Sequence, residues 1–415
     1  MSLIKAGSCA LFFCLCSWIW LFPFLAAGDV QHEPAVARFI ETGGFISSAD
    51  GSIAAQLNSD TPFIPASIIK IATALVALEV LGPSFRYKTE FYIRDKTTLY
   101  IRGSGDPFLV SEFVAAIARE LKDKGIERID RIVIDDSRFN LPTAADGSTG
   151  TDNPYDAPNS ALAVNFNSLA IQVNADTGVA TGESQTPLLP LSRFIGRQLP
   201  PGQHRVNVSS FASGTTADIN HRYVAELFAA FLRKEGLDVG TALQSGTVDT
   251  DCVLIYTFIN PKSVREIVED CLKFSNNFIA NQLFLSCGAA RFGYPATWEK
   301  GRQALRQVLT EQFLVEGHGF DIHEGSGLSR RTRVTPRFMM AVLEAFKPYR
   351  HLLPGKETML IKSGTLTDVY CYAGYFNSRH ASDPFVIMLN QPQNTRQIVL
   401  EALHHHYLLI ERTTY

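Results

Sequence analysis

The segment from Ser67 to Leu81 constrains this chain most, because it combines a nearly continuous apolar run with a serine and a lysine at its start. A helix that is apolar on every side must be surrounded by other elements, so we expect a buried helix at about 67–81. Lys70 follows Ser67 by three residues, and this spacing places both side chains on one face of the helix. A lysine among apolar neighbours favours a chemical role over an exposed, structural one.

Ser67 and Lys70 have the chemistry of a nucleophile and its base. A serine hydroxyl is a weak nucleophile until a base removes its proton. Lysine can act as that base when burial or a nearby positive charge lowers its pKa. The N-terminus of the helix adds backbone N–H groups and a positive dipole end beside the serine. The motif alone is also compatible with an N-capping serine followed by an exposed lysine.

A second motif, Ser275-Asn276-Asn277, lies between two segments with helical patterns. The hydroxyl of Ser275 could pass a proton, and the amide of Asn277 could hold a substrate carbonyl. The structural alternative is that Ser275 caps the helix that follows it.

A third motif, Lys362-Ser363-Gly364-Thr365, follows the apolar run Met359–Ile361 and predicts a strand. Glycine in a strand lets a ligand approach the backbone closely. The positive charge and the hydroxyls of Ser363 and Thr365 suit a free carboxylate. The structural alternative is a solvent-facing edge strand.

Taken together in this order, the three motifs resemble those of penicillin-binding proteins and class A β-lactamases. The stretch from Ser67 to Ser275 is more than twice as long as that from Ser275 to Lys362, whereas class A β-lactamases are far more compact there. The long insertion is similar to that of the class C low-molecular-mass penicillin-binding proteins, the D-alanyl-D-alanine carboxypeptidase/endopeptidase family. Further stretches resemble this family across most of the chain: 99–107, 160–162, 165–167 and 325–330.

The chain departs from the family pattern at three places. Ser363 stands where threonine is usual, which keeps the hydroxyl and changes only the packing of a methyl group. Ala280-Asn281-Gln282 stands where the resemblance predicts Ala-Glu. The insertion is shorter than in the larger members, so we expect their third domain in reduced form.

The resemblance implies an α/β (α+β) fold, a β-lactamase/transpeptidase-like domain with a central antiparallel sheet flanked by helices. This catalytic domain would be built from residues 29–88 and 250–415. An inserted α/β domain would occupy 89–249, with a reduced third subdomain at about 168–205. The segment 177–201, rich in Gly, Thr and Pro, predicts a loop excursion.

The resemblance also implies a serine-type D-alanyl-D-alanine carboxypeptidase, and an endopeptidase too, that acts on peptidoglycan stem peptides and is acylated by β-lactam antibiotics. Ser67 would be acylated, Lys70 would be the general base, and Ser275 would relay the proton to the leaving D-alanine. Asn277 would hold the peptide, and Lys362 would support the site electrostatically. Ser363, Gly364 and Thr365 would bind the terminal carboxylate. The backbone N–H groups of Ser67 and Thr365 would form the oxyanion hole.

Asp152 is the candidate for pairing with a free ammonium group on the stem peptide, and Asp156 is the reserve. Both lie in the acidic, turn-like stretch 151–156, just before the family resemblance resumes at Ala161. The structural alternative is a surface turn in which aspartate accepts local hydrogen bonds.

Two other functions fit the same motifs. A β-lactamase-like hydrolase would add rapid hydrolysis of the drug, but no acidic residue has a spacing that marks a dedicated deacylating base. A non-catalytic wall-binding homologue is disfavoured by the complete set of motif residues. An α/β-hydrolase is excluded because the sequence has no Gly-x-Ser-x-Gly elbow.

Residues 1–28 predict a secretory signal peptide, and hence a periplasmic protein. Lys5 precedes an apolar run from Cys9 to Ala27 that ends in small residues. The run is also marginally long enough for an uncleaved membrane anchor. Without it, we expect at most peripheral membrane contact, and the net charge of −3 argues against a nucleic-acid partner.

Four cysteines remain after the signal segment, and their state is left open between disulfides and buried free thiols: Cys252, Cys271, Cys287 and Cys371. Their spacing does not resemble a zinc site. We therefore expect no metal and no cofactor.

Overall fold

The computed structural model describes residues 35–176, 178–211, 215–313, 319–356, 358–378 and 381–414. The expected signal peptide, 1–28, lies outside the described residues, as do Cys9, Cys14 and Cys16. Within the described ranges, no helix combines the length and the apolar content needed to cross a bilayer.

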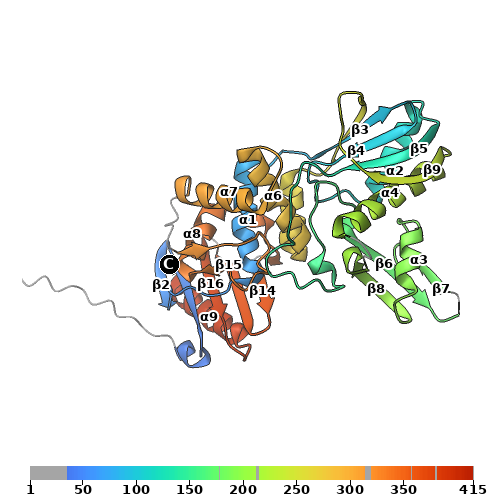
Figure 1. The fold of residues 1–415 in the computed structure, drawn as a ribbon. Helices are drawn as coiled ribbons and strands as arrows, with labels where there is room; N and C mark the ends of the chain where they lie inside the picture. The colour runs from blue at the N-terminus through green and yellow to red at the C-terminus, as the bar shows by residue number, and fades with distance from the viewer. Residues whose placement is uncertain are drawn as a thin grey trace, which may run out of the picture. The chain divides into compact units, whose positions relative to one another are not determined.

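A six-stranded antiparallel sheet joins the two ends of the described chain (Figure 1). The first hairpin pairs with the last strand, with Gly43 opposite Leu389. The strand order is β13-β14-β15-β16-β1-β2. These strands are β1 (Gly43–Ala49), β2 (Ser52–Leu57), β13 (Gly355–Lys356), β14 (Met359–Leu366), β15 (Val369–Asn377) and β16 (Ser382–Leu389). The expected central antiparallel sheet is confirmed.

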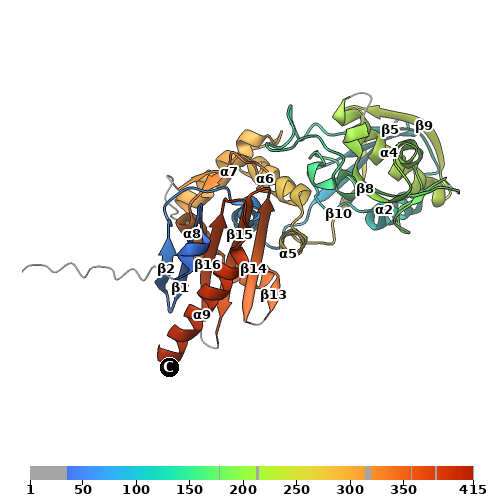
Figure 2. The same ribbon diagram turned by 90° about the horizontal axis from the view of Figure 1, so that it is seen from below.

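Helices cover both faces of this sheet, because its strands carry apolar side chains on each side. On one face, α1 (Lys70–Val80) and α8 (Pro336–Phe346) form a core with strand residues such as Val386. On the other face, α9 (Arg396–Thr414) buries Val399 and Leu403 against Phe376 and Phe385. Figure 2 shows α9 running across the strands. The N-terminal half of α1 is fully enclosed, as its apolar composition predicts.

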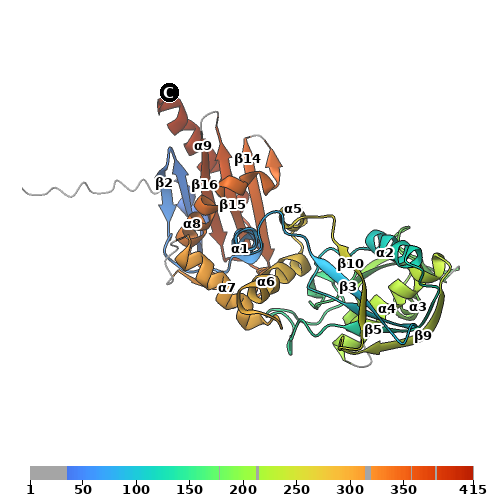
Figure 3. The ribbon, with the colours of Figure 1, turned by 90° about the horizontal axis from the view of Figure 1, so that it is seen from above.

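Three further helices complete the face that holds α1 (Figure 3). They are α5 (Val264–Phe274), α6 (Asn277–Phe292) and α7 (Trp298–Glu311). Helices α6 and α7 approach closely at two glycines, since a Cβ at Gly288 would lie 2.6 Å from the backbone nitrogen of Gly301. A short ladder, β11 (Phe320–Asp321) with β12 (Arg333–Val334), brackets the loop that follows α7.

A five-stranded mixed sheet lies in the inserted region, in the order β10-β3-β4-β5-β9. Two helices pack on it through a separate apolar core. These elements are β3 (Lys88–Arg94), β4 (Thr98–Arg102), β5 (Arg128–Asp135), β9 (Asp238–Ser245), β10 (Val253–Ile259), α2 (Ser111–Asp123) and α4 (Thr216–Lys234).

Strand β10 lies just after residue 250, where the return to the catalytic domain was expected. It pairs with β3 over Val253–Ile259, so it belongs to the inserted sheet rather than to the catalytic one. The chain reaches the elements around α1 only with α5, which begins at Val264.

The segment 177–201 also differs from the expected loop. It contributes β7 (Gly178–Thr181) and α3 (Pro190–Gly196) to a small unit with the strands β6 (Ser168–Asn174) and β8 (Gly202–Asn207). Pro190 begins α3, where its fixed φ suits the first helical turn. Leu191 and Ile195 bury this helix against the inserted core. The elements are too short to produce a recognisable periodicity.

The four described cysteines are free thiols. Cys271, Cys287 and Cys371 are buried, and Cys252 is half-buried. Of the two states left open by the sequence, the structure therefore has free thiols.

Candidate active site

Ser67 lies in a short 3-10 turn, η2 (Ala66–Ile69), that leads directly into α1. The expected α-helix thus begins three residues later, at Lys70. Neither helix start has a side-chain cap, so Ser67 does not act as an N-capping serine. Ala66, immediately before it, adopts a positive φ of 47°. A left-handed residue at this point is strained and is typical of a functional turn.

Lys70 connects three parts of the chain through its amine. Its Nζ lies 2.8 Å from Ser67 Oγ, 2.8 Å from Asn277 Oδ1 and 2.6 Å from the carbonyl oxygen of Ser326. The side chain is only 1% exposed. The structure therefore brings the first and second motifs into direct contact.

The three neighbours of Lys70 match a neutral amine. The oxygens of Asn277 and Ser326 can only accept, so they take the two N–H groups of an uncharged –NH₂. The remaining lone pair then faces Ser67 Oγ, whose hydroxyl can donate. Burial lowers the pKa of Lys70 to about 7, and the positive charge of Lys362 acts in the same direction. A large fraction of the lysine is therefore neutral near neutral pH.

Ser275 is the residue that ends α5, not a cap of the next helix. It adopts a left-handed conformation with φ 53°, and the N-cap of α6 is Asn276, whose side chain accepts from the backbone N–H of Ile279. The Ser275 hydroxyl is thereby free to face Lys362, whose Nζ donates to it at 2.9 Å. The structural alternative for Ser275 is wrong.

Asn277 is the first residue of α6 and links the site to the inserted region. Its Oδ1 accepts from Lys70, and its Nδ2 donates to the carbonyl oxygen of Tyr155 at 3.4 Å. Hydrogen bonds to both its oxygen and its nitrogen therefore fix the orientation of the Asn277 amide.

Strand β14 presents the third motif with alternating orientations. Lys362 is 2% exposed, and its Nζ also donates to the carbonyl oxygen of Ser363 at 2.8 Å. Burial lowers the pKa of Lys362 to about 8. Ser363 and Thr365 lie on the opposite, exposed side of the strand.

Gly364 allows β14 to approach the backbone of the nucleophile. A Cβ at this position would lie 2.9 Å from the backbone nitrogen of Ser67 and 2.8 Å from the carbonyl oxygen of Pro65. Any other residue would push the strand away from η2. The site thus combines a serine–lysine pair, a second serine–lysine pair and a strand edge within contact distance.

A model of the D-Ala-D-Ala carboxypeptidase 3 (S13) family matches residues 34–195 and 201–359. The chain belongs to this family. The family and the class of enzyme that the three motifs predict are confirmed.

Individual relatives agree at low sequence identity. The chain is 23% identical over 412 residues to the D-alanyl-D-alanine carboxypeptidase DacB of Haemophilus influenzae, covering 84% of this chain and 85% of the relative. It is 26% identical over 347 residues to a D-alanyl-D-alanine carboxypeptidase of Actinomadura sp. (strain R39), covering 74% of this chain and 64% of that one. The crystal structure of penicillin binding protein 4 from Haemophilus influenzae superposes with a TM-score of 0.71 at 21% identity, over 89% of this chain and 96% of that one. This likeness confirms the fold.

The sequence marked the loop around Ser326 as similar to the family but did not predict that it contributes to this S13 site. Glu324 is fully buried, and its carboxylate accepts from the backbone N–H groups of Ser326, Gly327 and Ser329. These bonds hold the Ser326 carbonyl against Lys70. The glycine-rich run 325–330 was a family signal, but a backbone carbonyl has no sequence signature of its own.

Asn281 and Gln282, which replace the expected acidic residue, are buried and bonded to neighbouring loops. Asn281 Oδ1 accepts from the backbone N–H of Gly325. Gln282 donates to the carbonyl oxygen of Ser160 and accepts from Asn159 Nδ2. Neutral amides therefore fill the buried positions of this S13 chain where the family resemblance predicts a carboxylate.

The two acidic candidates in the inserted region differ in their surroundings. Asp156 is buried, and its carboxylate accepts from the backbone N–H and hydroxyl groups of Thr149 and Thr151. It therefore has the structural role of a turn acceptor. Asp152 is exposed, and its carboxylate has no hydrogen-bond partner within the described ranges. Among the described residues, no hydrogen bond or ion pair joins the Asp152 side chain to the motif residues.

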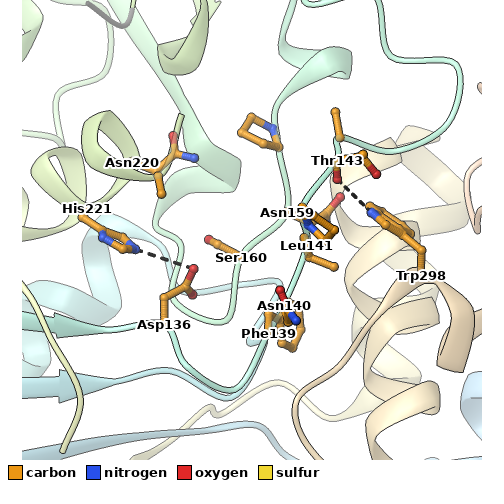
Figure 4. A pocket seen from close by; sticks show the side chains of 14 residues that line it. Asp136, Phe139, Asn140, Leu141, Thr143, Asn159, Ser160, Asn220, His221 and Trp298 are labelled. Atoms are coloured by element: carbon orange, nitrogen blue, oxygen red, sulfur yellow. Dashed lines mark hydrogen bonds and ion pairs between the residues drawn. The ribbon is translucent and has the colours of Figure 1, made fainter. Parts of the chain in front are cut away.

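A separate pocket of about 320 Å³ is lined by residues of the inserted region and by Trp298, the first residue of α7 (Figure 4). Asp136 and His221 point toward one another in it, with His221 Nε2 3.6 Å from Asp136 Oδ2. His221 Nδ1 also lies 2.7 Å from Ser245 Oγ. None of the motif residues lines this pocket, so it is distinct from the candidate active site.

Proposed function

We propose that this S13 protein cleaves D-alanyl-D-alanine peptides through an acyl-enzyme on Ser67. The observation that carries the proposal is the contact between Lys70 Nζ and Ser67 Oγ at 2.8 Å, with two fixed acceptors on the same amine. An amine held in this way can take a proton only from the serine. The names of the relatives, D-alanyl-D-alanine carboxypeptidases, support the same substrate class.

In the acylation step, Lys70 removes the proton of Ser67 while Oγ attacks the carbonyl carbon of the penultimate D-alanine. The carbonyl oxygen becomes an oxyanion in the tetrahedral intermediate. The backbone N–H groups of Ser67 and Thr365 would stabilise it, and the close approach of Gly364 to Ser67 supports this assignment. The bond to the terminal D-alanine then breaks.

The leaving amine needs a proton, and Ser275 would deliver it. Ser275 Oγ accepts from Lys362 Nζ at 2.9 Å, so its own hydrogen can point into the site. A protonated Lys362 would replace the proton that Ser275 gives. Asn277 would hold the peptide backbone, and Ser363, Gly364 and Thr365 would bind the terminal carboxylate. Water then attacks the ester, and one of its protons would return to Lys362 through Ser275. Lys70 would give its proton back to the departing Ser67 Oγ, which regenerates the enzyme.

A β-lactam should acylate the same serine, because its ring opens by the same attack. Penicillin binding protein 4 of Haemophilus influenzae has been solved in complex with a β-lactam, which supports this expectation. Incubation of the folded protein with penicillin should add one drug mass, located on Ser67 by peptide mapping of the intact adduct. Ser67→Ala should show no adduct. An adduct on another residue, or none on folded wild-type protein, would reject the mechanism.

The cellular setting follows from the same proposal. We place the enzyme in the periplasm, where peptidoglycan stem peptides lie, and assign it both carboxypeptidase and endopeptidase activity. The division into a catalytic and an inserted domain, with the small β6–β8 unit as a reduced third subdomain, belongs to this proposal as well. The expected signal segment supports the periplasmic location. The separate sheets, which share no strands, support the division into domains.

Asp152 would pair with a free ammonium group on the stem peptide. Its exposed carboxylate is available for a ligand, and the same loop contacts Asn277 through Tyr155. Asp152→Asn should lower kcat/KM severalfold for a stem peptide that bears the ammonium, while β-lactam acylation stays unchanged because penicillin lacks that group. Equal losses on both compounds would indicate misfolding, and no loss on the peptide would remove Asp152 from the site.

A further inference from the structure

A groove of about 690 Å³ follows the exposed side of β14, between the strand and helix α9. Met359, Ile361 and Ser363 alternate along its floor, and Tyr372 of the neighbouring strand lies beside them. Arg396, the first residue of α9, lines the same groove. Ser363 belongs to the third motif, so the groove adjoins the place where the terminal carboxylate would bind.

Arg396 is held against the third motif by three interactions. Its Nη1 donates to Thr365 Oγ1 at 2.7 Å and to the carbonyl oxygen of Gly364 at 2.9 Å. Its guanidinium carbon lies 4.5 Å from the centre of the Tyr372 ring, where a cation is attracted to the aromatic face. These contacts hold the guanidinium beside Thr365. Its Nε and Nη2 have no protein acceptor among the described residues.

The bond from Arg396 also determines what Thr365 can do. Because Thr365 Oγ1 accepts from the arginine, its hydroxyl hydrogen remains available for a ligand. A carboxylate at this position would meet the hydroxyls of Thr365 and Ser363 and the unused N–H groups of a guanidinium. This combination is the geometry that arginine offers to carboxylates in proteins.

The position of Arg396 on its helix is unfavourable unless it has another role. A cation in the first turn of a helix faces the positive end of the helix dipole. The first turn of α9 contains no acidic residue that would offset this repulsion. An anion bound beside the guanidinium would offset it instead.

We propose that Arg396 binds the free carboxylate of the leaving residue together with Ser363 and Thr365, and so selects substrates whose leaving residue carries that carboxylate. This assignment rests on the proposed function and names the group that sets its specificity. The lysines of the site do not replace the arginine, because their amines are already engaged. Lys70 Nζ bonds to Ser67, Asn277 and Ser326, and Lys362 Nζ bonds to Ser275 and to the carbonyl oxygen of Ser363. The guanidinium of Arg396 stays charged at every pH at which the enzyme works.

The test compares two substrates that differ only at the C-terminus, an acylated peptide ending in D-Ala-D-Ala and its C-terminal amide. In Arg396→Gln, kcat/KM for the free acid should fall about tenfold to hundredfold, mainly through KM, while the amide is cleaved at the wild-type rate. Arg396→Lys should keep part of the preference, because it keeps the charge but loses the forked geometry. Gln397→Ala, in the same groove, should leave the ratio of the two substrates unchanged.

Three results would overturn the assignment or its basis. Equal losses on acid and amide in Arg396→Gln would mean that the arginine only ties α9 to β14. An unchanged ratio of acid to amide would mean that the carboxylate binds elsewhere. Wild-type protein that cleaves neither peptide and forms no penicillin adduct on Ser67 would reject the proposed function itself, and the assignment of Arg396 with it.

Discussion

Lys70 and Lys362 are buried amines whose protonation states must differ for the proposed chemistry. Lys70 must be neutral to accept the proton of Ser67, and burial lowers its pKa to about 7. Lys362 must be charged to resupply Ser275, and burial lowers its pKa to about 8. The fraction of molecules that meets both conditions is greatest between these values and falls gradually on either side.

The rate of acylation by a β-lactam should therefore have a bell-shaped pH dependence. It should rise through about pH 7 as Lys70 loses its proton, and fall above about pH 8 as Lys362 loses its own. Rapid-quench measurement of the adduct over this range gives the profile. Lys362→Arg should remove the descending limb, since arginine keeps its proton. A rate that is flat across both values would contradict these roles.

Lys70→Arg is the complementary control for this pH profile. Arginine cannot provide a neutral amine, so acylation should fall by orders of magnitude at every pH while the fold is retained. Near-normal acylation in this variant would move the base to another residue, such as Ser275 with Lys362.

The sequence predicted the side chains of this site better than its backbone. Ser67, Lys70, Ser275, Asn277 and Lys362 carry chemistry in their residue types and their spacing, and the structure places them in contact. The Ser326 carbonyl could not be predicted, because every residue has one and only the fold determines where it points. Arg396 was missed for a similar reason, since a single arginine at a helix start has no distinctive pattern.

Asn277 is the first residue of α6, and the close packing of α6 on α7 depends on two glycines, Gly288 and Gly301. A Cβ at Gly288 would lie 2.6 Å from the backbone nitrogen of Gly301 and 2.7 Å from the carbonyl carbon of Lys300. These atoms belong to the backbone of α7 and cannot move aside individually. The two helices must therefore separate to admit even a methyl group.

Gly288→Ala should lower the free energy of unfolding by about 1–3 kcal/mol, the usual range for overpacking a core. Urea unfolding followed by circular dichroism measures the change. Ala290→Leu adds a larger group at an exposed position of the same helix and should have little effect. A Gly288→Ala protein as stable as the wild type would show that this helix contact is not tight.

A long element was predicted from the sequence, and a short one was not. The buried helix α1 follows from a nearly continuous run of apolar residues. Helix α3 has only seven residues, which is too few for a periodic pattern to stand out. The pairing of strand β10 with β3 was not predicted, because sequence hydrophobicity does not identify a pairing partner.

At the scale of the whole molecule, the active site should reduce stability. Two lysines are enclosed at 1% and 2% exposure, and a buried ammonium is costly even with several acceptors. The unfolded chain keeps an ordinary lysine pKa of 10.5, whereas the folded value for Lys70 is about 7. Between these values the unfolded state binds the extra proton, so the contribution of Lys70 to stability rises with pH.

Lys70→Met should therefore differ from the wild type in the slope of stability against pH. Relative to the wild type, the variant should be most stable at or below about pH 7, and this advantage should disappear toward pH 10.5. The hydrogen bonds lost by the substitution are the same at every pH, so the slope isolates the charge. Parallel stability curves for the two proteins would show that Lys70 titrates normally in the folded state.

The pairing of Gly43 with Leu389 has a consequence for the order in which the molecule can assemble. Strand β1 must wait until nearly the whole chain has been synthesised before its partner β16 exists. The five-stranded sheet needs only residues 88–259 and can form earlier. A chain that ends before β14, which begins at Met359, lacks the third motif and cannot be acylated. The appearance of β-lactam reactivity during translation and refolding would time the last, long-range step of folding, which topology makes the slow one.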